Sequence, residues 1–187
     1  MTVRHATSVD LPRIGVTATK AFSDDPVMRW LYPDDDYFEL SPADVIWMGA
    51  RWLGTNSLWC TEDAVAMAGW IPPGRPEVEM PPNERQHPQW RLDRFAAIGA
   101  TMAEHTPPEP HWYLNMLATH PDWQRQGLGA SLMRPTFDIA DDMGVPCYLE
   151  TETVANVAYY RHHGFEVRGE WDVPLDGPHM WGMLRTR

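Results

Sequence analysis

Residues 120–130 read HPDWQRQGLGA, and this stretch decides the fold. The segment before it, WYLNMLAT (112–119), is mostly apolar and typical of a buried strand. The segment after it, SLMRPTFDIADDMG (131–144), has the pattern of a helix. The stretch is therefore predicted to join a strand to a helix, through a polar turn with two glycines one residue apart.

The two glycines point to an anion site. The first backbone N–H groups of a helix have no partner within the helix, and the positive end of the helix dipole lies there. Such a helix start binds phosphate well. Because glycine has no side chain, a phosphate can approach the backbone at Gly127 and Gly129. Polar and cationic side chains at the rim could also contact it, from Gln124, Arg125 and Gln126. The spacing predicts a pyrophosphate cradle over 124–130, although a glycine pair before a helix is also common in plain tight turns.

The rest of the chain alternates between strand and helix patterns. The helix at 11–22 has Ser8 or Asp10 as its N-cap, and the helix at 41–54 has Ser41 as N-cap, Pro42 at its first position and Gly54 at its end. A turn, a short helical piece and an acidic turn occupy 23–36, and 74–89 is a Pro-rich loop. Further helices are predicted at 90–105, 128–143 and 155–164, and strands at 2–6, 57–63, 64–73, 111–119, 146–152, 165–174 and 179–187. This order predicts one α/β domain, residues 1–187, built on a layered mixed sheet.

Composition narrows the class of partner. The net charge of −11 argues against nucleic acid as a partner and mildly favours a cationic small molecule, although acidic surfaces often serve only solubility. Cys60 and Cys147 are expected to be buried thiols in a reducing compartment. The N-terminus lacks the apolar run of a signal peptide, and no run reaches the length of a membrane span. We therefore expect a cytoplasmic protein that binds no membrane.

Two segments resemble one family. LATHPDWQRQGLGASLM (117–133) is similar to motif A of the GNAT superfamily of acetyl-CoA-dependent N-acetyltransferases, with its (Q/R)-x-x-G-x-(G/A) signature. LETETVANVAYYRHHGFEV (149–167) resembles the next segment of that family. The resemblance implies a mixed sheet of six to seven strands, splayed between strands 4 and 5, with helices on both faces. It also implies acetyl-CoA as co-substrate, no metal, and direct attack by an amine in a ternary complex.

One branch of the family fits more closely. AFSDDP (21–26), PDWQRQGLG (121–129), GVPCYLET (144–151) and VPLDGPHMWGM (173–183) resemble puromycin N-acetyltransferase and related antibiotic-modifying enzymes. This likeness implies an antibiotic- or nucleoside-like small-molecule amine as acceptor, and a monomer or homodimer. A protein or peptide N-acetyltransferase and a non-catalytic acyl-CoA-binding module remain alternatives.

The resemblance also assigns cofactor contacts. The pyrophosphate would contact the loop from Gln124 to Ala130, and the pantetheine arm would pair with strand 4 near a bulge at Asn115 or Met116. A backbone N–H near Leu117 would face the thioester oxygen. Asn156 would contact the cofactor, or act as N-cap of the last helix. The implied cofactor set is Leu117, Ala118, Thr119, Gln124, Arg125, Gln126, Gly127, Leu128, Gly129, Ala130 and Asn156.

Proton transfer would use two side chains. Tyr160 aligns with the general acid of the family, and its alternative role is core packing. Many members carry a general-base Glu on strand 4, but Tyr113 stands at that position. Glu150 is the best remaining base or else a structural hydrogen-bonding group, and Glu152 with a water chain is the fallback.

Three further features of the sequence support additional predictions. The adjacent His162 and His163 point apart on a helix and are expected to bind no metal. Pro135 predicts a kink in its helix without a functional account. The segment 21–36 combines aromatic side chains with Asp24 and Asp25, which suits an aromatic, cationic amine or a capped helix end; the aromatic residues are Phe22, Trp30 and Tyr32.

Overall fold

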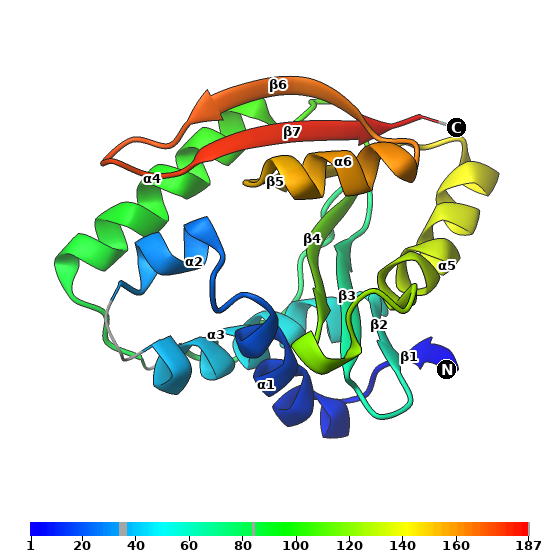
Figure 1. The fold of residues 1–187 in the computed structure, drawn as a ribbon, viewed down its shortest axis with the longest axis horizontal. Coiled ribbons are helices and arrows are strands. Elements are labelled where there is room, and N and C mark those ends of the chain that lie inside the picture. Colours follow the sequence, from blue (N-terminus) through cyan, green and yellow to red (C-terminus); the bar gives the residue numbers. More distant parts are fainter. Residues whose placement is uncertain (34–36, 84, 187) are drawn as a thin grey trace.

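A computed structural model describes residues 1–33, 37–83 and 85–186, and Figure 1 shows its fold. Three helices follow the first strand, and a hairpin and a fourth helix precede the strand-to-helix junction. The elements are β1 (Val3–His5), α1 (Leu11–Ala21), α2 (Pro26–Leu31), α3 (Tyr37–Gly54), β2 (Leu58–Thr61), β3 (Ala66–Ile71), α4 (Gln89–His105), β4 (Trp112–Thr119), α5 (Leu128–Met143), β5 (Cys147–Thr151), α6 (Val154–His162), β6 (Glu166–Asp172) and β7 (His179–Arg185). Short 3-10 turns lie at Ser8–Asp10 and Pro121–Trp123.

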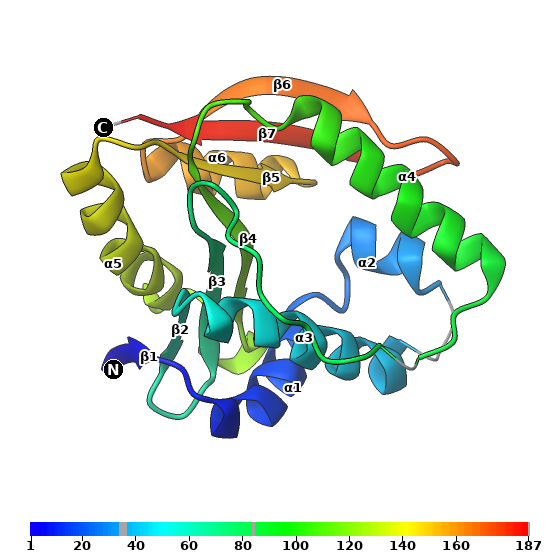
Figure 2. The ribbon, with the colours of Figure 1, turned by 180° about the vertical axis from the view of Figure 1, so that it is seen from behind.

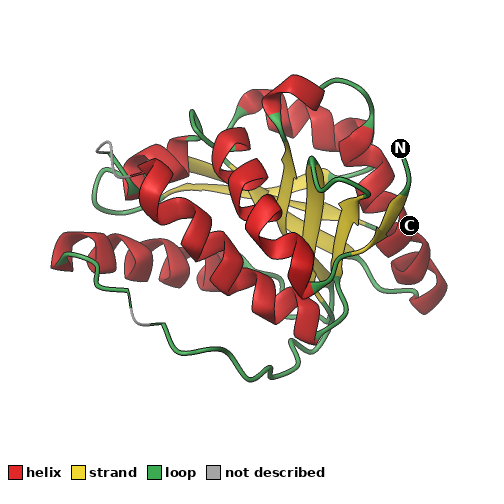
Figure 3. Cartoon of the chain, turned by 90° about the horizontal axis from the view of Figure 1, so that it is seen from below, coloured by secondary structure: helices red, strands yellow, loops and turns green. Residues whose placement is uncertain are grey.

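The strands form one seven-stranded sheet in the order β1-β2-β3-β4-β5-β7-β6. β4 and β5 pair in parallel, and the other neighbouring strands pair antiparallel. Helices cover both faces, as the views from the front, the back and below show (Figures 1, 2 and 3). The predicted mixed α/β architecture with helices on both sides of the sheet is confirmed.

The sheet opens in its middle. β4 and β5 pair at only two positions, Trp112 with Cys147 and Tyr113 with Tyr148, and then separate. On its other edge β4 stays paired with β3, with a register shift that leaves Asn115 without a partner. The predicted splay and the bulge at Asn115 are both present, and from Leu114 onward the edge of β4 that faces β5 is unpaired by any strand in the described part of the chain.

Two apolar clusters hold the layers together. α5 and α6 cover one face, where Leu132, Met133 and Phe137 pack on Trp70 and Leu149. α1 and α3 cover the other face with a second cluster that includes Ile14, Val45, Trp52, Leu58 and Met67. Burial of these side chains supplies the main driving force for the layered arrangement.

Gly69 in β3 allows a close helix–sheet contact. A Cβ atom at this position would lie 2.5 Å from the indole ring of Trp52. Glycine is therefore required for α3 to lie this close to the sheet. The Trp52 indole N–H in turn donates to Oδ1 of Asn115 at 3.2 Å, so packing behind the sheet orients the side chain at the bulge.

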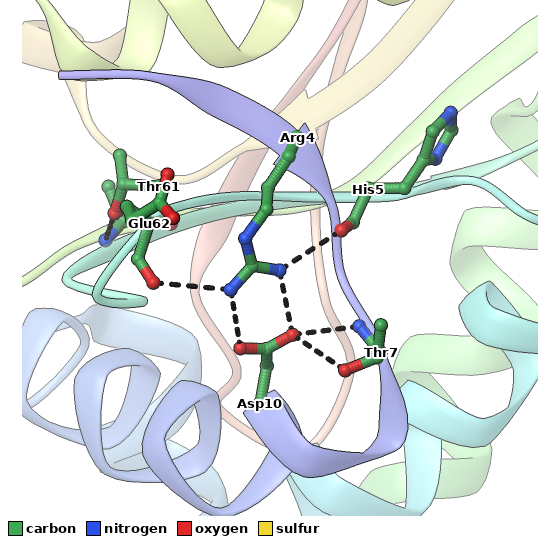
Figure 4. Close-up of polar contacts among 7 residues, drawn as sticks. Arg4, His5, Thr7, Asp10, Thr61 and Glu62 are labelled. Atoms are coloured by element: carbon green, nitrogen blue, oxygen red, sulfur yellow. Dashed lines mark hydrogen bonds and ion pairs between the residues drawn. The ribbon is translucent and has the colours of Figure 1, made fainter.

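A polar cluster fastens the N-terminus (Figure 4). The guanidinium of Arg4 donates to both carboxylate oxygens of Asp10 at 2.8 and 2.9 Å, and to the carbonyl of Glu62 at 3.1 Å. Asp10 also accepts from the N–H and hydroxyl of Thr7. The Arg4 hydrogen bond, ahead of the Thr7 contacts, lowers the pKa of Asp10 despite its partial burial. The cluster ties β1 to the start of α1.

One predicted boundary is wrong. α3 begins at Tyr37, so Ser41 and Pro42 lie inside the helix and do not cap it. Long-range contacts stabilise the extra turn, because the Tyr37 hydroxyl donates to the carbonyl of Thr19 at 2.7 Å and Ser41 bonds with the Thr19 hydroxyl. The end at Gly54 is confirmed, and the predicted acidic turn at 34–36 lies outside the described residues.

Other predictions concern single groups. Both cysteines are buried and free, and burial raises the pKa of Cys60 to about 11 and of Cys147 to about 12. α5 continues through Pro135.

Within residues 1–33, 37–83 and 85–186, no helix combines the length and apolar character needed to cross a membrane. No cluster of three or more His, Cys, Asp or Glu suited to a metal occurs in the same residues.

Candidate active site

A cavity of about 880 Å³ lies where β4 and β5 separate. Its wall includes strand residues of β4 and β5, the junction before α5, the start of α6 and the link from α1 to α2. The junction and the link are far apart in sequence, and only the fold brings them together. The cavity therefore joins the predicted cofactor segment to the predicted acceptor segment.

The junction has the backbone of an anion site. Gly127, the N-cap of α5, has a left-handed φ of +77°, and Arg125 has a φ of +60°. Alternating conformations of this kind turn successive N–H groups toward one side. The first helical bond in the turn runs from the Ser131 N–H to the Gly127 carbonyl at 3.1 Å. The N–H groups of residues 128–130 therefore have no carbonyl partner within α5.

The two glycines have different roles. A Cβ on Gly127 would meet no atom within 4 Å, so this glycine is needed for its backbone conformation and leaves the space in front of it open. A Cβ on Gly129 would lie 2.6 Å from the Tyr159 hydroxyl, so the second glycine admits α6 to the edge of the junction. The close approach of a phosphate to these glycines stays a prediction, and the contact between Gly129 and Tyr159 was not predicted from the sequence.

The edge of β4 presents alternate backbone groups to the cavity. The His120 N–H donates to the Val65 carbonyl at 2.8 Å, which identifies that pair as hydrogen-bonded. Because such pairs alternate along an antiparallel ladder, the backbone groups of Leu117 and Thr119 point away from β3, into the gap. The Gln124 side chain donates to the Thr119 carbonyl at 3.2 Å from that side.

Glu150 is a buried carboxylate at the opening of the sheet. Each of its oxygens exposes less than 1 Å² and has no hydrogen-bond partner of ordinary geometry among the described residues. Burial raises the pKa of Glu150 to about 7, and the nearby Tyr113 and Tyr148 phenols and the charge of Arg75 limit the rise. Tyr113 occupies the position where the resemblance expects a glutamate, and its phenol lies beside Glu150. The carboxylate is thus supplied by β5.

Tyr160 lines the same cavity from α6. Its ring packs against Phe165 with centroids 5.7 Å apart, so the core-packing role holds for the ring. Its hydroxyl makes no hydrogen bond to any residue that the structure describes. Burial, and then the charge of Glu152, raise the pKa of Tyr160 above its usual range, so the phenol stays protonated at neutral pH.

Asn156 is not the N-cap that the sequence allowed. Thr153 caps α6, and its hydroxyl accepts from the Asn156 N–H at 3.1 Å. The Asn156 side chain lines the cavity and donates to Glu152 at 3.3 Å. The amide is therefore free of a capping role and lies beside the two strands that separate.

A pair of carboxyl groups lies at the predicted acceptor end of the cavity. Glu152 and Asp25 both line the cavity. Burial first, and then the charge and hydrogen bond of Asp25, raise the pKa of Glu152 well above its usual range. Asp25 is also the N-cap of α2 and accepts from the Met28 N–H at 2.9 Å, which agrees with the predicted capped helix end. Sequence reasoning missed the pair because its members are distant in the chain.

Most of the predicted site residues share this cavity. Its lining includes Leu117, Thr119, Gln124, Arg125, Gly127, Leu128, Gly129, Glu150, Asn156 and Tyr160. Ala118 is buried against the other core and pairs with Met67, and Gln126 does not line the cavity. Ala130 lines a neighbouring cavity of about 610 Å³.

Comparison with known proteins agrees with this geometry. A sequence profile of the acetyltransferase (GNAT) family matches residues 20–165. Three solved structures share the fold. The first, a histone acetyltransferase HPA2 and related acetyltransferase from Corynebacterium glutamicum, is 22% identical over 99% of this chain and 95% of that chain, with a TM-score of 0.71. The second, the polyamine N-acetyltransferase of Drosophila melanogaster, is 10% identical over 100% of this chain and 99% of that chain, with a TM-score of 0.66. The third, the ribosomal-protein-S18-alanine N-acetyltransferase of Escherichia coli, is 18% identical over 99% of this chain and 92% of that chain, with a TM-score of 0.57. The match covers the cradle, the splayed strands and α6, and the chain belongs to the GNAT family of acetyltransferases.

Proposed function

We propose that the protein transfers an acetyl group from acetyl-CoA to an amine of a small molecule, by direct attack in a ternary complex. The observation that carries this proposal is a single cavity that joins a helix-start anion site, an open strand edge, a buried carboxylate and a protonated phenol.

The residues fit the parts of acetyl-CoA in order. The N–H groups at the start of α5, with Gln124 and Arg125, suit the pyrophosphate. The open backbone groups of Leu117 and Thr119 suit the amides of the pantetheine arm, which would bind like an added strand. The Asn156 amide lies where it can contact the same arm. These contacts would bring the thioester to the point where the strands separate.

Two side chains would carry out the proton transfers. As the amine nitrogen bonds to the acetyl carbon, Glu150 accepts the proton that the amine loses, and a base with a pKa near 7 suits this task at neutral pH. As the carbon–sulfur bond breaks, Tyr160 donates its proton to the sulfur. The Leu117 N–H, which points into the gap, can donate to the carbonyl oxygen as negative charge develops on it.

Two observations support the class of acceptor. Structural relatives include enzymes named for polyamine and arylalkylamine substrates, which fits a small amine. The aromatic and acidic residues near the α1–α2 link fit a cationic acceptor, and Phe22, Asp24 and Asp25 line the cavity. An antibiotic- or nucleoside-like amine is the acceptor we favour.

Release of free thiol from acetyl-CoA tests the proposal across puromycin, aminoglycosides, polyamines, aryl amines and peptides. We expect turnover with at least one small amine, and a loss of about 10²–10⁴ in kcat for Tyr160→Phe with acetyl-CoA affinity retained. Tyr159→Phe is the matched control, since it removes a neighbouring phenol from the same helix. Tight binding of CoA without turnover on any amine would contradict transferase activity and favour a binding module.

A further inference from the structure

The proposed reaction leaves one buried carboxyl pair without a task. Asp25, at the start of α2, and Glu152, just after β5, come from segments that lie side by side in the front and back views (Figures 1 and 2). Both line the reaction cavity beside Glu150. The pair is not needed for either proton transfer, because Glu150 and Tyr160 supply those.

The pair has no cationic partner of its own. Among the described residues, no Lys, Arg or His lies within ion-pair distance of Asp25 or Glu152. Asn156 donates one hydrogen bond to Glu152, and the Met28 N–H donates one to Asp25. Burying neighbouring carboxylates is costly unless a positive group or a proton compensates. A proton retained on Glu152, whose pKa is raised, supplies that compensation, and an incoming cation would take its place.

A second observation points to a ligand in the same cavity. Glu150 is almost fully buried, and neither of its oxygens has a hydrogen-bond partner of ordinary geometry in the described part of the chain, with the Tyr113 and Tyr148 phenols nearby. A buried acceptor without a donor is destabilising, so such a group is expected to meet a donor on the bound substrate. The cavity therefore offers two separate positions for positively charged or N–H-bearing groups.

The two positions have a defined spacing. Glu150 and Glu152 are two residues apart at the end of an extended segment, so their Cα atoms are separated by about 7 Å. Residues at this spacing point to the same side of a strand. A flexible chain of a few methylene groups spans that distance between two nitrogens.

We propose that the acceptor carries two basic nitrogens: one loses its proton, attacks as a neutral amine beside Glu150 and is acetylated, and the second stays cationic between Asp25 and Glu152. This inference rests on the proposed function and names its substrate class. Asp25 and Glu152 would then determine specificity, while the acetylated nitrogen would be chosen by its distance from the second charge.

A series of linear monoamines and diamines tests the inference. Each diamine from three to eight carbons is compared with the monoamine of equal length, so that burial of methylene groups cancels. We expect the wild type to prefer the diamine by about tenfold or more in kcat/KM, the size of a charged hydrogen bond. The preference should reach a maximum within the series.

Conservative variants test whether Asp25 and Glu152 cause the preference for diamines. Asp25→Asn keeps a capping oxygen for α2 and Glu152→Gln keeps an acceptor for Asn156, so both are expected to fold. Each should bring the diamine and monoamine to near parity by raising KM for the diamine. Glu104→Gln, at an exposed carboxylate of α4 outside the cavity lining, is the matched control and should keep the preference.

Several results would overturn the inference. Equal kcat/KM for monoamines and diamines in the wild type would do so, as would a preference that Asp25→Asn and Glu152→Gln leave unchanged. A loss of kcat on monoamines in Glu152→Gln would instead assign Glu152 to the chemistry.

Calorimetric binding of butane-1,4-diamine to the CoA-loaded protein separates this inference from the proposed function. If no amine is turned over, the proposed function fails, but binding that weakens about tenfold or more in both variants still supports the diamine site. Binding that is absent, or equal in the wild type and both variants, overturns it.

Discussion

The two walls of the cavity are built in different ways. The wall proposed to bind the cofactor, called the cofactor wall, comes from β4, the junction, α5 and the start of α6, which all lie within residues 112–162. The acceptor wall combines the α1–α2 link with the end of β5, which are more than a hundred residues apart in the sequence. The first wall depends on local backbone conformation, and the second on long-range packing.

This difference separates the two tasks of the enzyme. A cradle of backbone N–H groups recognises a phosphate whatever the neighbouring side chains are, so it suits a co-substrate shared by the whole family. Side-chain carboxyls on a separate wall can change without disturbing the cradle. The contrast predicts that variants of one wall alter acetyl-CoA binding and variants of the other alter amine selection.

The largest effect is expected from Glu150→Gln, at the base of the acceptor wall. Removing the proton acceptor should lower kcat by about 10²–10⁴. In the wild type, kcat should rise with pH through about 7, because only the deprotonated carboxylate accepts a proton. The variant should lose this rise. Steady-state rates from pH 5.5 to 9 measure both, with Glu104→Gln on the exposed face of α4 as control; an unchanged profile would assign the base elsewhere.

The same substitution should stabilise the fold at high pH. The folded-state pKa of Glu150 is raised, so the unfolded chain loses this proton first and stability falls as pH rises from about 4.5 to about 7. Above that range Glu150→Gln should gain up to about 3 kcal/mol in unfolding free energy. Urea denaturation at pH 5 and pH 8 measures the difference, and an equal effect at both values would contradict the buried, unpaired carboxylate.

A smaller effect is expected in the cofactor wall from Gly127→Ala. The added Cβ meets no atom, but the left-handed φ costs about 1–2 kcal/mol, so acetyl-CoA should bind about tenfold more weakly as the loop relaxes. Discrimination among amines should not change. Gly99→Ala, within α4 and also in open space, is the control and should stabilise the protein by about 0.5–1 kcal/mol. Calorimetry measures the affinity for CoA in each variant. Altered amine selectivity in Gly127→Ala would contradict the claim that the two walls act separately on acetyl-CoA binding and amine selection.

The two walls also differ in how well the sequence predicts them. The glycine spacing and the alternation of helix and strand patterns located α5 within its observed bounds, because these signals are local. The start of α3 was missed, since contacts of Tyr37 and Ser41 with Thr19 override the local capping signal at Ser41. Asn156 was a plausible cap by residue type, but Thr153 has the required backbone conformation.

The Asp25–Glu152 pair is the part of the site that the sequence alone predicted least. Asp25 was recognised as a helix cap, and Glu152 only as a fallback base, because nothing local connects them. The two-residue spacing of Glu150 and Glu152 places both on one side of an extended segment, but their spacing was not used in the prediction. Their pKa values depend on burial and on partners from other elements, which residue spacing does not supply.

A crystal structure of the protein with CoA tests the central claim most directly. The account predicts the pyrophosphate on the N–H groups at the start of α5, the pantetheine arm along Leu117 and Thr119, and the sulfur within reach of the Tyr160 hydroxyl, with Glu150 across the gap between β4 and β5. A pyrophosphate bound elsewhere, or a sulfur too far from Tyr160 for even one bridging water, would contradict it.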